Sequence, residues 1–412
     1  MSVELNQSQW DLVIIGGGAA GFFSAIMAGE HASTPLNIAI LEKSGQLLQK
    51  VKISGGGRCN VTHDCHEPKE LIKHYPRGQK SLIGPFHHFG PSDTIQWFEN
   101  RGVELKVEKD GRMFPITDNS QTIIDCLSNA ADELGVQVFT KSGVSEIQQE
   151  GDLFTLTLDK GQILQSKKVI ICTGGTRLTA GAKLVESLGH DLLPAVPSLF
   201  TFTINHDLIT DLAGLSVNPV EVKIAGTKYE NRGPLLITHW GVSGPGILKL
   251  SAFAARDLAE QEYQFDLKVN WCPDVDLNKL IQLKRQEWGK RAIASRSALA
   301  SIPKRLWANM VQCAGITDKT TWSQLGKEET KALISIIQDC TLPVSGKSIN
   351  KDEFVTCGGV NANEITLKTM ESKLVPGIHF AGEVVNIDGV TGGFNFQNAW
   401  TSGYLAGRAA VV

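Results

Sequence analysis

The chain opens with a short apolar run, a cluster of glycines and a second apolar run. Asp11–Ile15 is dominated by branched apolar residues, the composition of a strand that is buried on both faces. Phe22–Ala28 has the composition of a helix, and Asn37–Glu42 is a second short strand that ends on an acid. The pattern therefore predicts a strand–helix–strand unit at the start of the fold.

Helices and strands continue to alternate through the first half of the chain. Amphipathic helices are predicted at 92–101 and 119–134, separated by a small hairpin between Val103 and Pro115. Further strands are predicted at 136–139, 143–147, 154–158 and 168–172. We expect the last of these strands to return to the sheet that contains the first two.

The pattern changes after Pro194. Residues 199–270 show short alternating segments separated by Gly, Asn and Pro, which is typical of an antiparallel β domain, whereas 276–339 has helical periodicity. A glycine-rich, strand-like pattern returns near the end of the chain. We therefore expect one α/β domain made from both chain ends, interrupted by a β insertion that carries a helical domain. The expected segments, in order, are residues 1–195, 196–274, 275–338, 339–351 and 352–412.

The residues between the first strand and the first helix, Gly16–Gly21, match G-x-G-x-x-G. Gly16 permits a tight turn, Gly18 lets the backbone approach a pyrophosphate, and Gly21 lets the helix pack closely on the sheet. The start of the helix offers free N–H groups to phosphates. Glu42 follows Gly21 by 21 residues, where an acid accepts a hydrogen bond from a ribose hydroxyl. Together these features predict a Rossmann-like, dinucleotide-binding α/β fold.

Composition and charge describe an ordinary globular protein of 412 residues, with 42% hydrophobic and 20% charged residues. The net charge of −3 gives no electrostatic reason to expect a nucleic acid or an anionic membrane. The uncharged run Leu12–Gly29 is short for a membrane span and contains five glycines. Eight cysteines without C-x-x-C or zinc spacing suit free thiols in a reducing cytoplasm. We expect a cytoplasmic protein without a metal, membrane or nucleic-acid partner.

A second glycine cluster lies within Ser54–Thr62. Three consecutive glycines precede Arg58, Cys59 and Asn60, so we expect the backbone to come close to a flat or anionic group. A flexible connection is the simpler alternative, but a linker has no need of these three side chains. Cys59 has no partner at C-x-x-C spacing, which disfavours thiol redox chemistry.

Two further glycine turns lie near the end of the chain. A strand that ends in Ala381, Gly382 and Glu383 fits a turn beside a ribityl chain and a pyrophosphate. The doublet Gly392–Gly393 opens a helix whose N–H groups can stabilise negative charge at N1 and O2 of a reduced flavin. Combined with the first glycine motif, these turns predict FAD as the cofactor and explain why the two chain ends must meet.

These stretches resemble the YhiN/BaiN-like family of FAD-dependent oxidoreductases, which have a two-dinucleotide-binding fold. The resemblance extends over almost the whole chain and is carried by Ile14–Gly21, Ser54–Thr62, Thr238–Pro245, Thr356–Val360 and Thr369–Gly407. It implies an FAD domain assembled from both chain ends, a barrel-like β insertion and a nested helical domain. It also implies flavin-dependent oxidoreductase activity, and one branch of the family reduces carbon–carbon double bonds of oxidised bile-acid steroids.

The resemblance further implies contacts with FAD, residue by residue. Those expected at the pyrophosphate are Gly16, Gly18, Ala19, Ala20 and Gly21. Those expected at the adenosine half are Glu42, Lys43, Val144, Thr173 and Gly174, and those near the pyrophosphate or the ring are Lys50, Gly57, Arg58 and Cys59. The ribityl–phosphate segment is expected at Gly382 and Glu383, and the isoalloxazine at Gly393, Phe394 and Asn395.

The leading hypothesis for function is an enzyme. FAD would accept a hydride from NAD(P)H and pass it to a small organic acceptor, such as a conjugated carbon–carbon double bond. No separate nicotinamide domain is predicted, so the nicotinamide would visit the flavin transiently. Arg112, His239 and Ser243 are candidate groups on the substrate side, although His239 also fits a satisfied histidine at a strand end.

The alternative hypothesis is a flavin-containing RNA-modifying or RNA-binding protein. Its support is a set of basic residues interleaved with Trp288 and Trp307, namely Lys284, Arg285, Lys290, Arg291, Arg296, Lys304 and Arg305. A solvated helix face explains the same residues more simply. A third alternative is a flavin-holding interaction protein without turnover, which would show no NAD(P)H oxidation.

Overall fold

The expected strand–helix–strand unit is present in the computed structural model, which describes residues 9–176, 179–348 and 355–411. β1 (Gln9–Ile15) lies parallel to β2 (Ile38–Leu41), and α1 (Ala19–His31) connects them. Leu12 to Ile15 and all of β2 are buried, which explains their uninterrupted apolar sequence.

β1 lies in the middle of a nine-stranded sheet. β9 (Ile163–Ile171) is parallel to β1 on the side opposite β2, as expected for the strand that returns to the sheet. β20 (Ile378–Phe380), from the end of the chain, is parallel to β9, with Ile378 beside Val169. The parallel strands therefore run in the order β20-β9-β1-β2-β6, and the chain end supplies one of them.

Antiparallel strands extend this sheet on the side of β9 that faces away from β1. β8 pairs with the first half of β9 and with β7, and β19 pairs with β20 and β18. The bounds of the sheet strands not yet given are β6 Gln137–Phe139, β7 Val144–Glu150, β8 Leu153–Leu158, β18 Ile365–Thr366 and β19 Glu371–Ser372.

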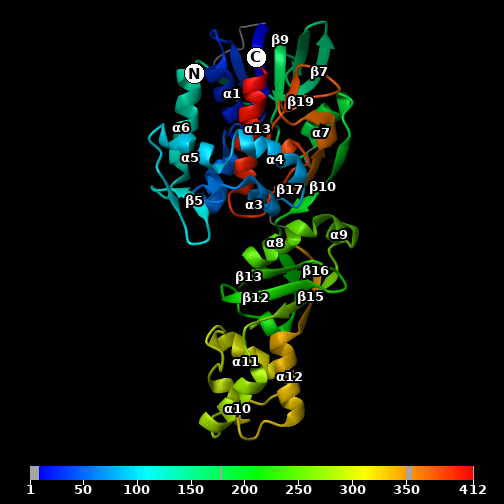
Figure 1. Ribbon diagram of the computed structural model, residues 1–412. Coiled ribbons are helices and arrows are strands. Elements are labelled where there is room, and N and C mark those ends of the chain that lie inside the picture. Colours follow the sequence, from blue (N-terminus) through cyan, green and yellow to red (C-terminus); the bar gives the residue numbers. More distant parts are fainter. Residues whose placement is uncertain (1–8, 177–178, 349–354, 412) are drawn as a thin grey trace. The chain divides into compact units, whose positions relative to one another are not determined.

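The last helix, α13 (Phe394–Ala409), packs against α1, and Figure 1 shows the two side by side. Two glycines of α13 allow a close approach. An added Cβ at Gly407 would lie 2.2 Å from the carbonyl oxygen of Ser24, and one at Gly403 would lie 3.1 Å from that of Ala20. Glycine at these two positions therefore joins the two ends of the chain.

The remaining elements of the same unit surround the sheet. The helices are α2 (Gln49–Gly57), α3 (Pro68–Leu71), α4 (Gln79–His88), α5 (Pro91–Glu99), α6 (Ser120–Glu133) and α7 (Thr179–Ser187). A small sheet is formed by β3 (Thr62–His63), β5 (Arg112–Pro115) and β4 (Leu105–Val107), and β10 (Leu192–Ser198) pairs with β17 (Val355–Val360). The expected helices near 92–101 and 119–134 and the hairpin between them are confirmed.

The chain divides into two compact units, and the second interrupts the first. Met1–Val196 and Val355–Val412 form one unit, and Pro197–Phe354 forms the other. The sequence-based boundary between residues 351 and 352 lies outside the described residues.

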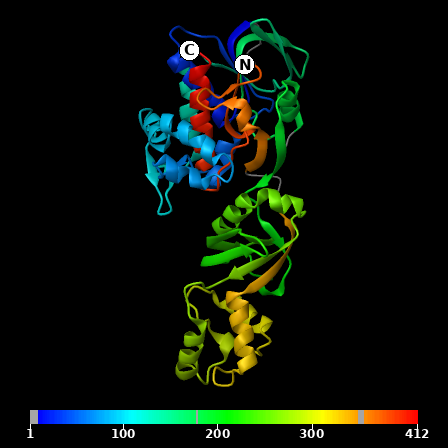
Figure 2. The same ribbon diagram turned by 45° about the vertical axis from the view of Figure 1, so that its right-hand side comes forward.

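The inserted unit contains a closed antiparallel barrel, as Figure 2 illustrates. Its strands, in order around the barrel, are β11 (Phe202–Ile204), β14 (Gly241–Ser243), β13 (Glu230–Ile237), β12 (Ser216–Ile224), β15 (Phe265–Asn270) and β16 (Cys340–Lys347). Pairing of β16 with β11 closes the ring. The expected mixed α/β fold with a barrel-like β insertion is thus confirmed.

Three helices are nested between β15 and β16: α10 (Leu277–Glu287), α11 (Lys304–Cys313) and α12 (Lys327–Gln338). They share one continuous apolar core with the barrel, which includes Trp271 and Leu342 from strands or strand ends and Trp307 and Leu333 from helices. The barrel and the three helices therefore form one packed unit.

One segment of the barrel region differs from the expected β structure. Within 199–270, α8 (Pro245–Phe253) and α9 (Ala255–Glu260) are helices. Pro245 occupies the first helical position, and Gly244 before it has a φ of 93°. Proline at a helix start, followed by Leu, Lys, Ala and Arg, favours a helix over a strand, so the local signal was present in the sequence.

Candidate functional site

The first glycine loop leaves an open space at the start of α1. Gly16 and Gly21 are confined, since an added Cβ would lie 2.3 Å from the Cys172 oxygen at Gly16 and 1.9 Å from the Gly16 oxygen at Gly21. A Cβ on Gly18 would meet no atom within 4 Å. Gly18 caps α1 without a side-chain hydrogen bond, so the first N–H groups of the helix, including those of Ala19 and Ala20, are oriented toward this end. This is the geometry that a pyrophosphate requires.

Glu42 lies beside this loop at the end of β2. Its Oε2 accepts a hydrogen bond from Gly17 N at 2.8 Å, and its Oε1 accepts one from Ser44 N at 2.7 Å. The neighbouring Lys43 is largely exposed, with Nζ 3.9 Å from Asp159 Oδ2. Gly143, just before Val144 and β7, packs against the Lys43 side chain. The structure therefore brings Glu42, Lys43 and Val144 together.

The end of β9 adjoins the same loop. Cys172 N donates to Ile15 O at 2.8 Å, which places the Thr173–Gly174 turn next to the end of β1. The buried Oγ1 of Thr173 makes no hydrogen bond within the described residues. Gly174 has a φ of 75°, and a Cβ there would meet no atom within 4 Å. An unpaired buried hydroxyl beside an open glycine fits a polar ligand that supplies the missing contact.

Gly382 connects the chain end to this loop. A Cβ on Gly382 would lie 2.8 Å from Cβ of Ala20, and Gly382 N donates to Ser402 Oγ at 2.8 Å. The first glycine motif and the turn after β20 are therefore in contact, although they are far apart in sequence.

Glu383 holds three segments together beside this contact. Its Oε1 accepts a hydrogen bond from Thr356 N at 2.7 Å, and its Oε2 forms an ion pair with Lys50. Lys50 comes from α2, and its side chain is 53% exposed. Thr356 is the first residue of Thr356–Val360, a stretch that carries the family resemblance. It was not among the site residues predicted from the sequence. Lys50 and Glu383 thus join the two halves of the discontinuous unit.

The loop before α13 is fixed by backbone and side-chain contacts. Gly393 has a φ of 92°, and a Cβ there would lie 2.4 Å from Thr62 O. Asn395 Oδ1 accepts a hydrogen bond from Gly389 N at 2.8 Å, and Asn395 Nδ2 donates one to Gly389 O at 2.8 Å. Tyr75 donates its hydroxyl to Phe394 O at 2.7 Å. A helix start held in this way presents N–H groups in a fixed direction, as stabilisation of a developing negative charge requires.

The Phe394 side chain itself is enclosed. Its ring is buried and lies nearly parallel to the imidazoles of His63 and His74, whose centres are 4.6 and 4.3 Å from it and 5.8 Å from each other. Any contact between Phe394 and a flavin therefore involves its backbone. The two histidines were not foreseen, because His63 and His74 are more than 300 residues away in sequence.

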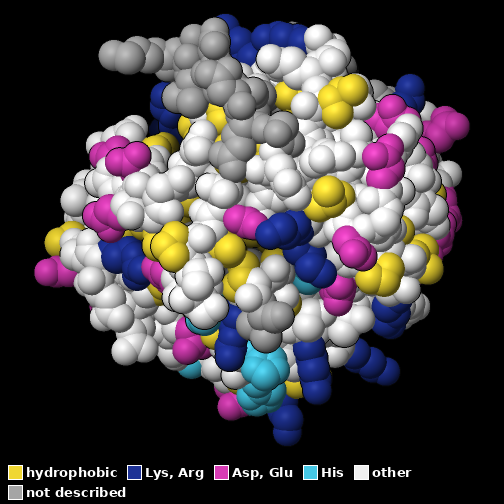
Figure 3. All heavy atoms as spheres, turned by 90° about the horizontal axis from the view of Figure 1, so that it is seen from above, with side chains coloured by type: hydrophobic (Ala, Val, Ile, Leu, Met, Phe, Trp, Pro, Cys, Tyr) yellow, Lys and Arg dark blue, Asp and Glu magenta, His cyan; other side chains and the backbone are white. Residues whose placement is uncertain are grey.

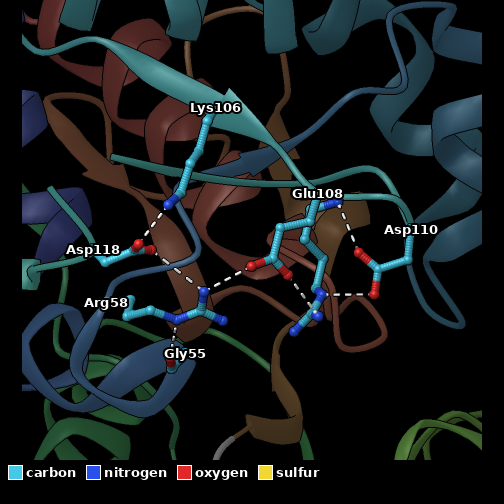
Figure 4. Close-up of polar contacts among 7 residues, drawn as sticks. Gly55, Arg58, Lys106, Glu108, Asp110 and Asp118 are labelled. Atoms are coloured by element: carbon cyan, nitrogen blue, oxygen red, sulfur yellow. Dashed lines mark hydrogen bonds and ion pairs between the residues drawn. The ribbon is translucent and has the colours of Figure 1, made fainter. Parts of the chain in front are cut away.

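Arg58 and Arg112 belong to an ion network on the small sheet. Figure 4 labels Arg58 and the carboxylates Glu108, Asp110 and Asp118. Arg58 Nη1 lies 2.7 Å from Glu108 Oε1 and 3.4 Å from Asp118 Oδ1, and its guanidinium lies 4.0 Å from the centre of the Phe114 ring. Arg112 Nη2 lies 2.8 Å from Glu108 Oε2, and Arg112 Nε lies 2.8 Å from Asp110 Oδ2. Both guanidinium groups are thus engaged by carboxylates.

Gly57 and Cys59 flank Arg58 in this loop. Gly57 has a φ of 86° and open space at its Cβ position. The Cys59 side chain is fully buried, and this burial raises its pKa to about 12. The thiolate is the reactive form of cysteine, so Cys59 is unreactive near neutral pH. All eight cysteines are free thiols.

The remaining substrate-side candidates lie in the inserted unit. His239 is exposed between β13 and β14, next to Trp240, whose exposed fraction is 60%. Ser243, on β14, accepts a hydrogen bond from Thr201 Oγ1 at 2.9 Å. His239 is therefore accessible, whereas Ser243 already has a partner within the barrel.

The basic residues noted for the RNA alternative occupy different environments. Trp307 is 1% exposed and donates to Ile293 O at 2.8 Å, so it belongs to the core rather than to a binding face. Arg285 donates hydrogen bonds to Leu325 O and Thr330 Oγ1, and Arg305 donates one to Asp211 O. Lys284, Arg291 and Arg296 instead gather around Trp288. Within residues 9–176, 179–348 and 355–411, no helix has the length and apolar composition of a membrane span.

Comparison with known proteins adds a family and relatives. The sequence pattern of the family described as "HI0933-like protein Rossmann domain" matches residues 10–409. The "Ribosomal RNA dihydrouridine synthase" of Escherichia coli is 33% identical over 413 aligned positions, which cover 98% of each chain. The "3-dehydro-bile acid delta(4,6)-reductase" of Clostridium scindens is 26% identical and covers 96% of this chain and 98% of the relative.

A solved structure agrees with the fold. The 3-ketosteroid-delta4-(5alpha)-dehydrogenase from Rhodococcus jostii, in complex with 4-androstene-3,17-dione, superposes with a TM-score of 0.52. The alignment covers 99% of this chain and 98% of that chain at 13% identity, which establishes likeness of fold alone.

Proposed function

The chain belongs to the HI0933-like Rossmann family, and from this premise we propose that this FAD-dependent oxidoreductase reduces the carbon–carbon double bond of uracil bases in RNA, with NAD(P)H as the electron donor. A uracil double bond is conjugated to a carbonyl group, so it accepts hydride at one carbon and a proton at the other. The products are dihydrouridine and NAD(P)⁺.

One observation carries the FAD part of the proposal. The ends of β1 and β9 and the turn at Gly382 form a single cradle with open space at Gly18 and Gly174 and an unpaired Thr173 hydroxyl. We assign the pyrophosphate to the start of α1, the adenosine to Glu42, Lys43 and Val144, and the flavin ring to the start of α13. When bound, FAD would supply two-electron, hydride-transfer chemistry between a nicotinamide and the double bond.

In this proposal the protein's own groups bind and orient the flavin and the substrate. N–H groups at the start of α13 stabilise negative charge on the reduced ring, and the Asn395–Gly389 hydrogen bonds hold them in place. Of the three substrate-side candidates, Arg112 and Ser243 are engaged by other side chains. Of these three, His239 is the residue whose side chain is exposed, and it stays our candidate on the substrate side.

RNA is preferred as the substrate because of the relatives. The E. coli protein, 33% identical over 98% of both chains, is named for making dihydrouridine in ribosomal RNA. From the net charge of −3 we expected no nucleic-acid partner. The charged residues are unevenly distributed along the chain, however, so the net charge does not argue against RNA here. The bile-acid reductase supports a second candidate, a steroid enone, with the same chemistry at the double bond.

The test measures reduction of the flavin by the donor and then formation of the product. Protein purified with its flavin is reduced under anaerobic conditions with NADH or NADPH, and flavin absorbance is monitored. Unmodified ribosomal RNA transcript is then added, and dihydrouridine is measured by mass spectrometry of the nucleosides. We expect the flavin to reoxidise as dihydrouridine forms. Reoxidation by a steroid enone but not by RNA would favour the second candidate, and failure of both nicotinamides to reduce the flavin would reject the proposed donor.

A further inference from the structure

The nested helices carry a strongly uneven charge. Residues 277–305 contain eight Lys and Arg and one Glu, a net charge of +7. The complete chain has a net charge of −3, so the other residues together carry −10. By contrast, the face shown in Figure 3 carries Lys and Arg interspersed with Asp and Glu. A positive segment within an acidic chain indicates an anionic partner for that segment.

Three of these cations gather around one indole. Lys284 Nζ lies 4.2 Å from the centre of the Trp288 ring, and the guanidinium carbons of Arg291 and Arg296 lie 5.0 and 5.2 Å from it. We call these four residues the Trp288 cluster. Lys284 is one turn before Trp288 at the end of α10, whereas Arg291 and Arg296 come from the loop that follows. The negative ring face therefore offsets the repulsion among the three cations.

The cluster retains most of its charge. Lys284 is paired with Glu287 at 2.6 Å, but Arg291 and Arg296 are exposed and make no ion pair within the described residues. An indole attracts a cation without neutralising it, so both guanidinium groups keep their donors for an external anion. This distinguishes the Trp288 cluster from Arg58 and Arg112, whose charges face carboxylates.

The loop that carries the two arginines is held in place by the core. Trp288 packs edge-on against Trp322, which stacks on Trp307 at 6.2 Å between ring centres. Trp307 Nε1 donates to Ile293 O at 2.8 Å, and Ile293 N donates to Thr320 O at 3.0 Å. The loop is therefore positioned before any partner binds, which reduces the entropic cost of binding.

From these observations we infer that the Trp288 cluster is an RNA-docking surface that binds backbone phosphates. The inference rests on the proposed function, because RNA is the polyanion which that function requires. Arginine forms paired hydrogen bonds with phosphate oxygens, and contacts of this kind position an RNA without reading its sequence. The cluster thus gives affinity, and the choice of uridine is made elsewhere.

The test compares two pairs of substitutions in the full-length, FAD-loaded protein. Arg291→Gln/Arg296→Gln removes two cations of the Trp288 cluster. The matched control, Lys327→Gln/Lys331→Gln, removes two exposed cations of α12 that also lack an ion pair within the described residues. Binding of a fluorescein-labelled, uridine-containing RNA hairpin is measured by anisotropy at several salt concentrations. Flavin content and thermal midpoint show that each variant is folded.

Counterion release sets the expected size of the effect. Loss of two phosphate contacts should weaken binding about ten- to thirtyfold at roughly 0.15 M salt and lower the slope of log affinity against log salt by about 1.4–1.8. The control should stay near the wild-type affinity. Equal losses in the two variants, or an unchanged affinity of the cluster variant, would overturn the inference. So would a loss of binding to phosphatidylglycerol vesicles without a loss of binding to RNA.

Dihydrouridine formation on the same samples separates this inference from the proposed function. If the wild type forms dihydrouridine while the cluster variant binds RNA normally, the docking surface is rejected and the function stands. If the wild type binds RNA through the cluster but forms no dihydrouridine, the function is rejected and the surface stands.

Discussion

Gly16, Gly18 and Gly21 show how three residues of one motif meet different physical constraints. Gly16 combines a φ of 114° with backbone atoms at contact distance, and Gly21 lies against the Gly16 carbonyl. Gly18 has a φ of −93°, which any residue can adopt, and no neighbour near its Cβ position. Folding thus requires glycine at residues 16 and 21, whereas the space beside Gly18 is left for a ligand.

Gly18→Ala should therefore separate cofactor binding from folding. The added methyl group meets no protein atom, so the free energy of unfolding of the apo-protein should change by less than about 0.5 kcal/mol. The same methyl group occupies the space assigned to pyrophosphate, so FAD affinity should fall by roughly tenfold or more, equivalent to about 1.4 kcal/mol. Urea unfolding and flavin titration measure the two quantities. Gly21→Ala is the contrasting variant and should destabilise the apo-protein; unchanged FAD affinity in Gly18→Ala would contradict the assignment.

Buried thiols give a prediction for alkaline stability. Burial raises the pKa of both Cys59 and Cys172 to about 12, from an ordinary value of 9.0. Above pH 9 the unfolded chain loses these protons while the folded chain keeps them, so stability should decrease between pH 9 and 12. The decrease approaches about 1.4 kcal/mol per pH unit for each thiol. Cys59→Ala/Cys172→Ala should lose less stability than the wild type between pH 8 and 10.5 in urea unfolding, and identical pH dependences would refute the thiol contribution.

At the scale of elements, the contact between α1 and α13 decides whether the cradle is complete. Gly407→Ala places a methyl group about where the Ser24 carbonyl lies, so the helices must separate. Overpacking of this kind typically costs about 1–3 kcal/mol. We expect a lower thermal midpoint and weaker flavin retention, because α13 carries the helix start assigned to the ring. Arg408→Ala, at the exposed neighbouring position, is the control; an equal effect in both variants would show that close packing is not the cause.

Elements with a strong local pattern could be predicted from the sequence, and long-range contacts could not. β1, α1, β2 and the start of α13 were located because buried strands are uniformly apolar and glycine doublets mark turns. α8 and α9 were missed because neighbouring alternating segments outweighed a proline helix start. The carboxylates that engage Arg58 lie 50 and 60 residues away, and no local signal connects them. The placement of FAD stays a prediction.

At the scale of the whole molecule, the FAD domain depends on its last residues. β20 lies against β9 in the interior of the sheet, and Gly382 contacts Ala20. A chain ending at Val344 keeps the complete glycine motif but lacks β20 and α13. We expect it to be colourless and prone to aggregation, because the edge of β9 and one face of α1 become exposed. Flavin absorbance and light scattering measure this, and a soluble fragment with stoichiometric FAD would contradict the discontinuous domain.

A complementary deletion serves as the control. β10 and β17 pair on either side of the insertion, with Gly358 packed against Pro194 and Ala195. Replacing residues 199–352 by a short Gly–Ser linker should therefore preserve the sheet and retain FAD. Loss of flavin from this variant as well would show that the insertion contributes to the binding site.

The interrupted connectivity also sets an order of events during translation. Domains commonly fold as they are synthesised, starting from the N-terminus. Here Pro197–Phe354 is continuous and is synthesised before β20 and α13, so the inserted unit should fold first. The residues before it can complete their sheet only after β20 and α13 have been made. A released chain that ends at Val375 should protect the barrel from protease yet bind no flavin. We therefore expect flavin colour only once α13 has left the ribosome, and none from a chain that terminates before α13.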